Sequence, residues 1–233
     1  KPVINLGAAT TICSGDPITL DAGNAGATYS WSPGGATTQS ITVNPTVNTT
    51  YTVTVTKDGC SNSGSRAITV TPKPVINLGA ATTICSGDPI TLDAGNAGAT
   101  YSWSPGGATT QSITVNPTVN TTYTVTVTKD GCSNSGSRAI TVTPKPVINL
   151  GAATTICSGD PITLDAGNAG ATYSWSPGGA TTQSITVNPT VNTTYTVTVT
   201  KDGCSNSGSR AITVTPKPVI NLGAATTICS GDP

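Results

Sequence analysis

The stretch Tyr51-Thr52-Val53-Thr54-Val55-Thr56 alternates strictly between apolar side chains and threonine. An alternation with a period of two indicates a β-strand that has one buried face and one face in water. Threonine suits the wet face because a β-branched side chain fits a pleated surface. No stretch of the chain shows the spacing of an amphipathic helix, so the sequence predicts an all-β protein.

Shorter runs of the same kind surround this stretch, and turn sequences such as Ser14-Gly15-Asp16-Pro17 and Asp58-Gly59 separate them. About six or seven short strands with frequent turns predict a β-sandwich. We expect strands near Val3–Leu6 with a continuation at Thr11–Cys13, Ile18–Asp21, Thr28–Ser32, Ala36–Thr38, Ser40–Val43, Tyr51–Thr56 and Ala67–Thr71. The predicted core consists of Leu6, Ile12, Ile18, Leu20, Tyr29, Trp31, Ile41, Val43, Tyr51, Val53, Val55, Ile68 and Val70.

The whole pattern recurs without change. The stretch KPVINLGAATTICSGDP begins at Lys1, Lys73, Lys145 and Lys217, so the period is 72 residues. This is longer than the roughly 20–50 residues of a solenoid unit and fits a small domain. The predicted domains are 1–72, 73–144 and 145–216, and 217–233 begin a truncated fourth copy. We expect the chain to be an excerpt of a longer array; a designed consensus array is the alternative.

Thr71-Pro72-Lys73-Pro74 joins one repeat to the next. Two prolines make a short, stiff connection, unlike a flexible tether rich in glycine and serine. The sequence therefore predicts that the sandwiches are arranged as an extended rod.

The composition excludes several kinds of function. Ten basic and ten acidic residues give zero net charge, and charged residues are only 9% of the chain. We therefore expect no nucleic-acid partner, because nucleic acids are bound mainly through Lys and Arg. Histidine, the commonest general base and metal ligand, is absent. No apolar run reaches the roughly 20 residues of a membrane span. We expect no catalytic site, no metal, no cofactor and no enzymatic activity.

The acidic residues and the sequon have ordinary interpretations. Asp16, Asp21 and Asp58 are scattered and lack the clustering that a calcium site needs, so turn formation is the better interpretation. Asn48-Thr49-Thr50 matches the glycosylation sequon but also lies in a turn, where asparagine is common. The sequence leaves glycosylation open.

Two aromatic positions favour an immunoglobulin-like sandwich. Trp31 lies on the third predicted strand, where such folds bury a tryptophan, and Tyr51 opens a later strand at the position of a tyrosine corner. We expect the side chains at these two positions to be core residues in every repeat. They are Trp31, Tyr51, Trp103, Tyr123, Trp175 and Tyr195.

The order of motifs resembles a known family. CSGDPITL, YSWSPG, TYTVTVT and DGC follow one another in every full repeat, from Cys13 to Cys60 in the first. This order is similar to the PKD-like and immunoglobulin-like repeats of very large secreted surface proteins of the Bacteroidota. These include gliding-motility adhesins and other cargo of the type IX secretion system. The resemblance implies export, attachment to the cell surface, and an adhesive or spacer role.

Three functions remain open from the sequence. The first is a structural and adhesive cell-surface thread, in which identical repeats sum many weak contacts by multivalency. Its partners would be neighbouring repeats, identical chains alongside, and an unknown surface or glycan ligand. The second is a passive stalk that carries a binding or catalytic module elsewhere in the chain. The third is a carbohydrate-binding module, which would need exposed aromatic side chains.

Seven cysteines and no Cys-x-x-Cys motif predict disulfides in an oxidising compartment, with free thiols as the alternative. In a sandwich with alternating strands, Cys13 lies at one pole and Cys60 at the other, about 17 Å apart before loops are added. A disulfide needs Cα atoms within about 7 Å. We therefore favour bonds between repeats, Cys13–Cys132 and Cys85–Cys204, with Cys60, Cys157 and Cys229 pairing beyond the excerpt. The alternative is a set within repeats, Cys13–Cys60, Cys85–Cys132 and Cys157–Cys204.

Overall fold

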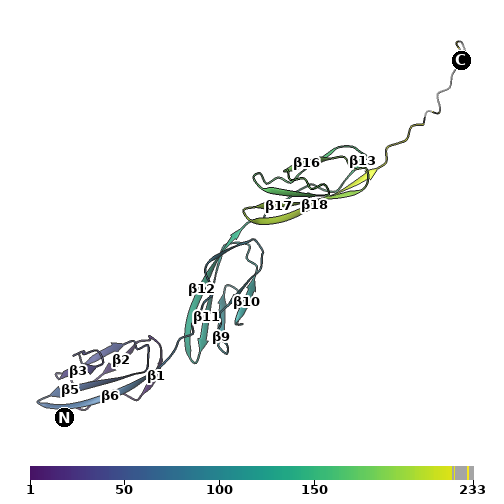
Figure 1. The fold of residues 1–233 in the computed structure, drawn as a ribbon. Helices are drawn as coiled ribbons and strands as arrows, with labels where there is room; N and C mark the ends of the chain where they lie inside the picture. Colours follow the sequence, from purple (N-terminus) through teal and green to yellow (C-terminus); the bar gives the residue numbers. More distant parts are fainter. Residues whose placement is uncertain (222, 224–229, 231–233) are drawn as a thin grey trace. The chain divides into compact units, whose positions relative to one another are not determined.

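The structure is a computed structural model that describes all residues except 222, 224–229 and 231–233. It contains three matching sets of six β-strands, and the described residues form no helix (Figure 1). The first set is β1 (Thr10–Cys13), β2 (Ile18–Asp21), β3 (Thr28–Ser32), β4 (Ser40–Val43), β5 (Thr49–Lys57) and β6 (Cys60–Thr71). The second is β7 (Thr82–Cys85), β8 (Ile90–Asp93), β9 (Thr100–Ser104), β10 (Ser112–Val115), β11 (Thr121–Lys129) and β12 (Cys132–Thr143). The third is β13 (Thr154–Cys157), β14 (Ile162–Asp165), β15 (Thr172–Ser176), β16 (Ser184–Val187), β17 (Thr193–Lys201) and β18 (Cys204–Thr215).

Each set folds into two sheets. In the first set, one sheet has the order β1-β6-β5-β3 and the other pairs β2 with β4. All pairings are antiparallel except that of β1, which runs parallel to β6 with Cys13 opposite Thr71. The protein is thus all-β, and its sandwiches are immunoglobulin-like. The contacts between residues divide the chain into two compact units. One unit consists of Lys1–Thr82 and Pro89–Thr141, and the other consists of Thr83–Asp88 and Val142–Pro233.

The core of the first sandwich lies between its two sheets. The alternating run of β5 places Tyr51, Val53 and Val55 inside, and Val53 and Val55 are completely buried. Trp31 of β3 is 1% exposed, and its indole Nε1 donates a hydrogen bond to the carbonyl oxygen of Thr38 at 2.9 Å. All thirteen residues predicted for this core belong to it, with Ile12, Ile18, Ile41, Val43 and Val70 partly buried. Prediction missed Ala22, which is buried, and Ile4, which packs against the core.

The aromatic side chains predicted for the core are buried in all three repeats. Tyr51, Tyr123 and Tyr195 are each 7% exposed, and the three tryptophans are each 1% exposed. The hydroxyl of a second core tyrosine, Tyr29, holds a turn. The Tyr29 hydroxyl lies 2.8 Å and 2.7 Å from the carbonyl oxygens of Gly23 and Asn24.

A tight hairpin connects the two longest strands. Lys57 pairs with Cys60, so only Asp58 and Gly59 form the loop. Both have a positive φ, of 52° and 76°, as a type I′ turn requires. This turn places Cys60 at the first position of β6, at one pole of the sandwich.

Three predicted strands differ from the observed ones. Val3–Leu6 and Ala36–Thr38 form no strand. The last strand, predicted to begin at Ala67, begins at Cys60, because the hairpin pairs Cys60 with Lys57 and extends the ladder along the whole of β5. The residues of the early half of β6 are mainly serine, asparagine and glycine, so they show no apolar alternation.

Side chains, rather than a ladder of backbone bonds, hold the segment before β1 against β6. The Asn62 side-chain amide donates to the carbonyl oxygen of Pro2 at 2.9 Å, and the Arg66 Nε donates to that of Ala8 at 2.8 Å. Ile4 fills the space that Gly64 leaves on β6. A Cβ atom at Gly64 would lie 2.6 Å from the Cγ2 atom of Ile4, far closer than van der Waals contact allows.

Adding a methyl group at this glycine should therefore destabilise each sandwich. We expect the changes Gly64→Ala, Gly136→Ala and Gly208→Ala, made together, to lower the free energy of unfolding by about 1–3 kcal/mol per repeat through overpacking. Urea denaturation followed by circular dichroism measures the loss. The matched control changes the exposed neighbours, Ser65→Ala, Ser137→Ala and Ser209→Ala. Equal stability of the two variants would contradict this packing.

Candidate functional site at the junctions between repeats

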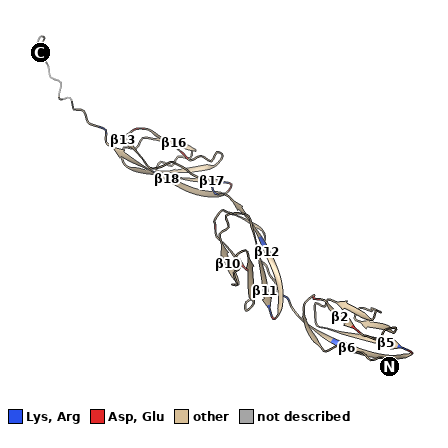
Figure 2. Cartoon of the chain, turned by 180° about the vertical axis from the view of Figure 1, so that it is seen from behind, with Lys and Arg blue, Asp and Glu red and all other residues tan. Residues whose placement is uncertain are grey.

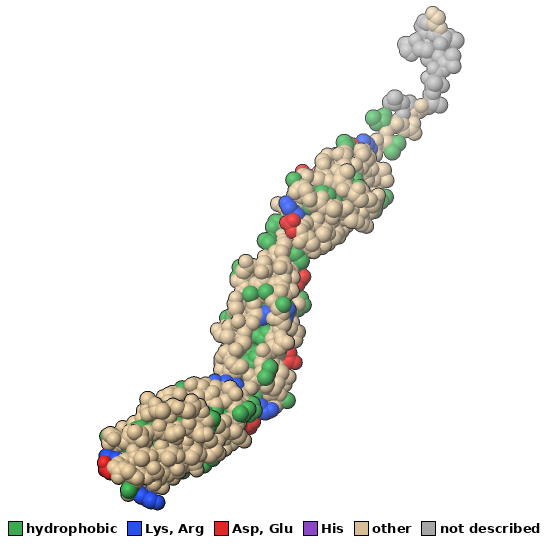
Figure 3. All heavy atoms as spheres, turned by 60° about the vertical axis from the view of Figure 1, so that its left-hand side comes forward, with side chains coloured by type: hydrophobic (Ala, Val, Ile, Leu, Met, Phe, Trp, Pro, Cys, Tyr) green, Lys and Arg blue, Asp and Glu red, His purple; other side chains and the backbone are tan. Residues whose placement is uncertain are grey.

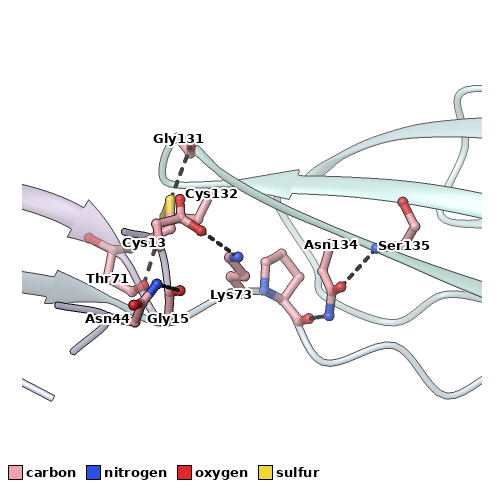
Figure 4. Close-up of polar contacts among 11 residues, drawn as sticks. Cys13, Gly15, Asn44, Thr71, Lys73, Gly131, Cys132, Asn134 and Ser135 are labelled. Carbon is pink, nitrogen blue, oxygen red and sulfur yellow. Dashed lines mark hydrogen bonds and ion pairs between the residues drawn. A yellow bond between two sulfur atoms is a disulfide. The ribbon is translucent and has the colours of Figure 1, made fainter. Parts of the chain in front are cut away.

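The structure brings cysteines of successive repeats together. Cys13 ends β1, Cys132 begins β12, and the two form a disulfide with Cα atoms 5.5 Å apart (Figure 4). Cys85 and Cys204 form the equivalent disulfide, with Cα atoms 5.6 Å apart. Each disulfide lies inside one of the two compact units. The sulfur atoms of Cys13 and Cys132 lie 3.8 Å from the carbonyl oxygens of Gly131 and Thr71, respectively.

The register of β1 explains why one repeat cannot close its own disulfide. Cys13 lies level with Thr71, the last residue of β6, whereas Cys60 is the first residue of that strand. Eleven residues of extended chain separate these two levels by about 36 Å. The third repeat has the same arrangement, with Cys157 level with Thr215 and Cys204 at the start of β18. The structure does not bring together the pairs Cys13–Cys60, Cys85–Cys132 and Cys157–Cys204.

The free cysteines are more exposed than the disulfide-bonded cysteines that begin β12 and β18. Cys60 and Cys157 carry free thiols and are exposed, whereas Cys132 and Cys204, which occupy the same position in their repeats as Cys60, are 2% exposed. The preceding repeat therefore covers the pole at which the bonded cysteine lies. Cys229 lies outside the described residues.

An ion pair accompanies each junction. Lys73 of the linker places its Nζ atom 2.6 Å from the Asp16 Oδ1 atom of the preceding repeat, and Lys145 and Asp88 repeat this contact at 2.6 Å. Asp16 thus has a second role besides the predicted turn. Both side chains are partly exposed, so each pair contributes only about 0.2–1 kcal/mol. Fifty-seven residues separate Lys73 from Asp16, so no local pattern could have indicated the pair.

Side-chain amides fix the start of each repeat near the junction. The Asn134 side chain donates to the carbonyl oxygen of Pro74 at 2.9 Å, and the Asn96 side chain donates to that of Val75 at 2.8 Å. An open hollow of about 270 Å³ lies beside this segment. Its lining consists of Pro72, Lys73, Pro74, Val75, Asn96, Lys129 and Asp130.

The three aspartates of a repeat do not gather. Asp21 accepts hydrogen bonds from the Gly23 backbone N–H at 2.8 Å and from the Gln39 side chain at 3.1 Å. Asp58 occupies the hairpin turn. Within the part of the chain that the structure describes, no group of three or more potential metal ligands occurs. The same part contains no helix that could cross a membrane.

Acid should weaken every sandwich through Asp21, Asp93 and Asp165. The backbone hydrogen bond from Gly23, and next the Gln39 amide, lower the pKa of Asp21 below its usual value; Gly95 and Gly167 act likewise in the other repeats. A carboxyl whose folded pKa is depressed stabilises the protein above its unfolded pKa, and this stability is lost as the pH falls through the folded pKa. We expect the melting temperature to fall below about pH 4. The variant with Asn at all three positions should lose part of this pH dependence; an unchanged dependence would contradict the assignment.

Charged and aromatic side chains are sparse at the surface. Figure 2 shows few charged residues along the ribbon, and the face seen in Figure 3 consists mainly of uncharged side chains and backbone. Among the residues that the structure describes, the exposed large apolar ones are valines and one isoleucine, namely Val3, Val47, Val75, Val119, Val147, Val191, Val219 and Ile220. The buried tryptophans cannot stack on a sugar. Asn48 of the sequon is exposed, and its Oδ1 atom accepts a hydrogen bond from the Val70 backbone N–H at 2.7 Å.

Comparison with known proteins finds matches only among solved structures. No family model and no curated protein matches the chain. A mutated fragment with three immunoglobulin domains of titin is 14% identical, with a TM-score of 0.40, and the match covers 89% of this chain and 96% of the fragment. Extracellular domains 3–5 of Drosophila OTK are 11% identical, with a TM-score of 0.31, and the match covers 91% and 96%. The eight N-terminal immunoglobulin domains of DSCAM are 15% identical, with a TM-score of 0.34, and the match covers 89% and 39%. None of these findings supports the resemblance to Bacteroidota repeats.

Proposed function

We propose that this chain is part of an extracellular structural protein in which immunoglobulin-like repeats, joined by disulfides, form a long thread. The observation that carries the proposal is the pairing of Cys13 with Cys132 and of Cys85 with Cys204. Disulfides persist in oxidising, extracellular environments. A disulfide, an ion pair and a linker with two prolines at each junction all restrict bending, and this suits a thread rather than a flexible tether. The domains of the thread are the repeats 1–72, 73–144 and 145–216.

The repetition of one surface suits weak adhesion. A repeat that binds a neighbouring chain or a cell surface weakly presents the same contact again in each copy, so the contacts sum. The low charge density and zero net charge also let identical chains lie side by side without strong charge repulsion. The alternative is a passive stalk, and the absence of exposed tryptophan from the described residues favours it over a sugar-binding module.

Small-angle scattering tests the thread. One sandwich measures roughly 35–40 Å along its strands, so three in a row span on the order of 110 Å. We expect a maximum dimension at or above this value for the oxidised chain. A compact particle would contradict the proposal. Binding of arrays with increasing repeat number to a cell surface then separates adhesion, in which affinity rises with number, from a passive stalk, in which it does not.

A further inference from the structure

The cysteine spacing divides the chain into alternating long and short segments. Cys13 and Cys60 are 47 residues apart, whereas Cys60 and Cys85 are 25 residues apart, and the same spacings recur at Cys132 and Cys157. The long segment contains most of one sandwich. The short segment contains the last strand of one repeat, the linker, and the first strand of the next repeat. Each disulfide joins the end of one short segment to the start of another, so a covalent path made only of short segments and disulfides contains few residues.

The short segments are already extended in the folded protein. Their first half is the strand β6, which is extended over its whole length. Their second half corresponds to Pro2–Cys13 in the first repeat. There Pro2 is bonded to Asn62 and Cys13 lies level with Thr71, so eleven residues of chain cover nine residues of β6. Nine strand residues span about 30 Å, whereas eleven fully extended residues reach at most about 40 Å.

The corresponding segment of the third repeat is also nearly extended. The Asn206 side chain donates to the carbonyl oxygen of Pro146 at 2.9 Å, and Cys157 lies level with Thr215. Segment 146–157 thus follows β18 from near its start to its end. Little slack remains in either half of a short segment.

We propose that the short segments and the disulfides form the path that bears tension along the array, and that they make it nearly inextensible. This inference rests on the proposed structural function. Force that enters at Cys60 runs along β6, through the linker to Cys85, and across the Cys85–Cys204 bond into β18. The path passes from the first repeat to the third through 25 residues of backbone. The 47-residue segments, with the strands equivalent to β2–β5, lie outside it.

A second path of the same kind interleaves with the first. It crosses from Cys13 to Cys132 through the disulfide and continues along β12 and the linker to Cys157. At the junction of the first two repeats, one path therefore crosses as peptide backbone and the other as a disulfide. The roles exchange at the next junction, where Cys85–Cys204 carries the first path. Two covalent connections cross each of these junctions, so a single broken bond leaves the other in place.

Unfolding of a sandwich then adds almost no length. Two repeats without disulfides contain 144 residues and extend to about 520 Å when unfolded. The 25 residues of a short segment extend to about 90 Å at most. A thread built in this way stays short under loads that open its sandwiches, and a sandwich that opens refolds between fixed ends.

Single-molecule pulling tests the path on the full chain. One handle is attached to the exposed thiol of Cys60 and the other to Thr215→Cys, with Cys157→Ser and Cys229→Ser to leave these two thiols alone. The stapled path between the handles has 36 residues, and the direct backbone has 155. The oxidised chain should reach a contour length of about 130 Å with no further lengthening before rupture, and the fully reduced chain about 560 Å through unfolding steps.

A matched variant assigns the effect to one bond. With Cys85→Ser and Cys204→Ser added, the shortest path uses Cys13–Cys132 and has 130 residues, so the contour length should rise to about 470 Å. Unfolding steps that lengthen the oxidised chain beyond about 130 Å would overturn the load path, as would free thiols at Cys85 and Cys204 in the oxidised chain. A compact particle in scattering, combined with the short contour length, would contradict the thread but not the load path.

Discussion

Replacing the buried tryptophan of every repeat by alanine should lower the free energy of unfolding by about 3–5 kcal/mol per repeat. Trp31, Trp103 and Trp175 are each 1% exposed and are among the largest fully buried side chains of the protein. Their removal leaves a cavity and also leaves the carbonyl oxygen of Thr38, Thr110 or Thr182 without its indole donor. A domain this small buries only about 60% of the surface of its unfolded chain, so the loss brings it close to unfolding.

Urea denaturation followed by circular dichroism measures this effect. The control is phenylalanine at the same three positions, which keeps an aromatic ring in the core and removes the indole N–H. It should cost clearly less than alanine. Unchanged melting of the alanine variant would show that the rings lie outside the core.

Removing both disulfides should lower the free energy of unfolding by an amount similar to that of the tryptophan substitutions. Each one closes a loop between cysteines that are 119 residues apart, and in the chain-entropy model a loop of this length stabilises the folded state by about 4–5 kcal/mol. We expect the chain with serine at Cys13, Cys85, Cys132 and Cys204 to melt more than about 10 °C below the oxidised parent. Differential scanning calorimetry measures the shift.

The sequence offers a matched control for this experiment. Cys60 and Cys157 are exposed and unbonded, so serine at these two positions should leave the melting temperature unchanged. The reduced parent should have the same melting temperature as the four-serine variant. A reduced parent that melts with the oxidised one would contradict any stabilising role of the disulfides.

The sequence predicted the fold where the apolar alternation is strong. In the run of β5, in the short runs of β2, β3 and β4, and at the tryptophan, the apolar character of each side chain itself indicates that the side chain is buried. The early half of β6 could not be predicted, because Ser61, Asn62 and Ser63 become strand only through their pairing with Thr56, Val55 and Thr54. The exposure of the residues in Val3–Leu6 alternates as it would in a strand. Side-chain hydrogen bonds from Asn62 and Arg66, rather than a backbone ladder, nevertheless hold this part of the chain in place.

The contacts at the junctions between repeats were only partly predictable, because most of them join residues that are far apart in the sequence. The order of the strands places Cys13 and Cys60 at opposite poles, and this alone favours bonds between repeats. The ion pair of Lys73 with Asp16 and the fit of Ile4 over Gly64 depend on residues that are far apart in the sequence. No local pattern marks such contacts.

The central claim is that disulfides join successive repeats, and chains with a single pair of cysteines test it directly. Because the repeats are identical, peptide mapping of the parent cannot assign the bonds. One variant keeps only Cys13 and Cys132, the other keeps only Cys13 and Cys60, and serine replaces the remaining cysteines. Each folded chain is oxidised, alkylated and weighed by mass spectrometry. We expect the Cys13/Cys132 chain to be fully bonded within the monomer and the Cys13/Cys60 chain to keep both thiols; an internal bond in the Cys13/Cys60 chain, with free thiols in the other, would contradict the account.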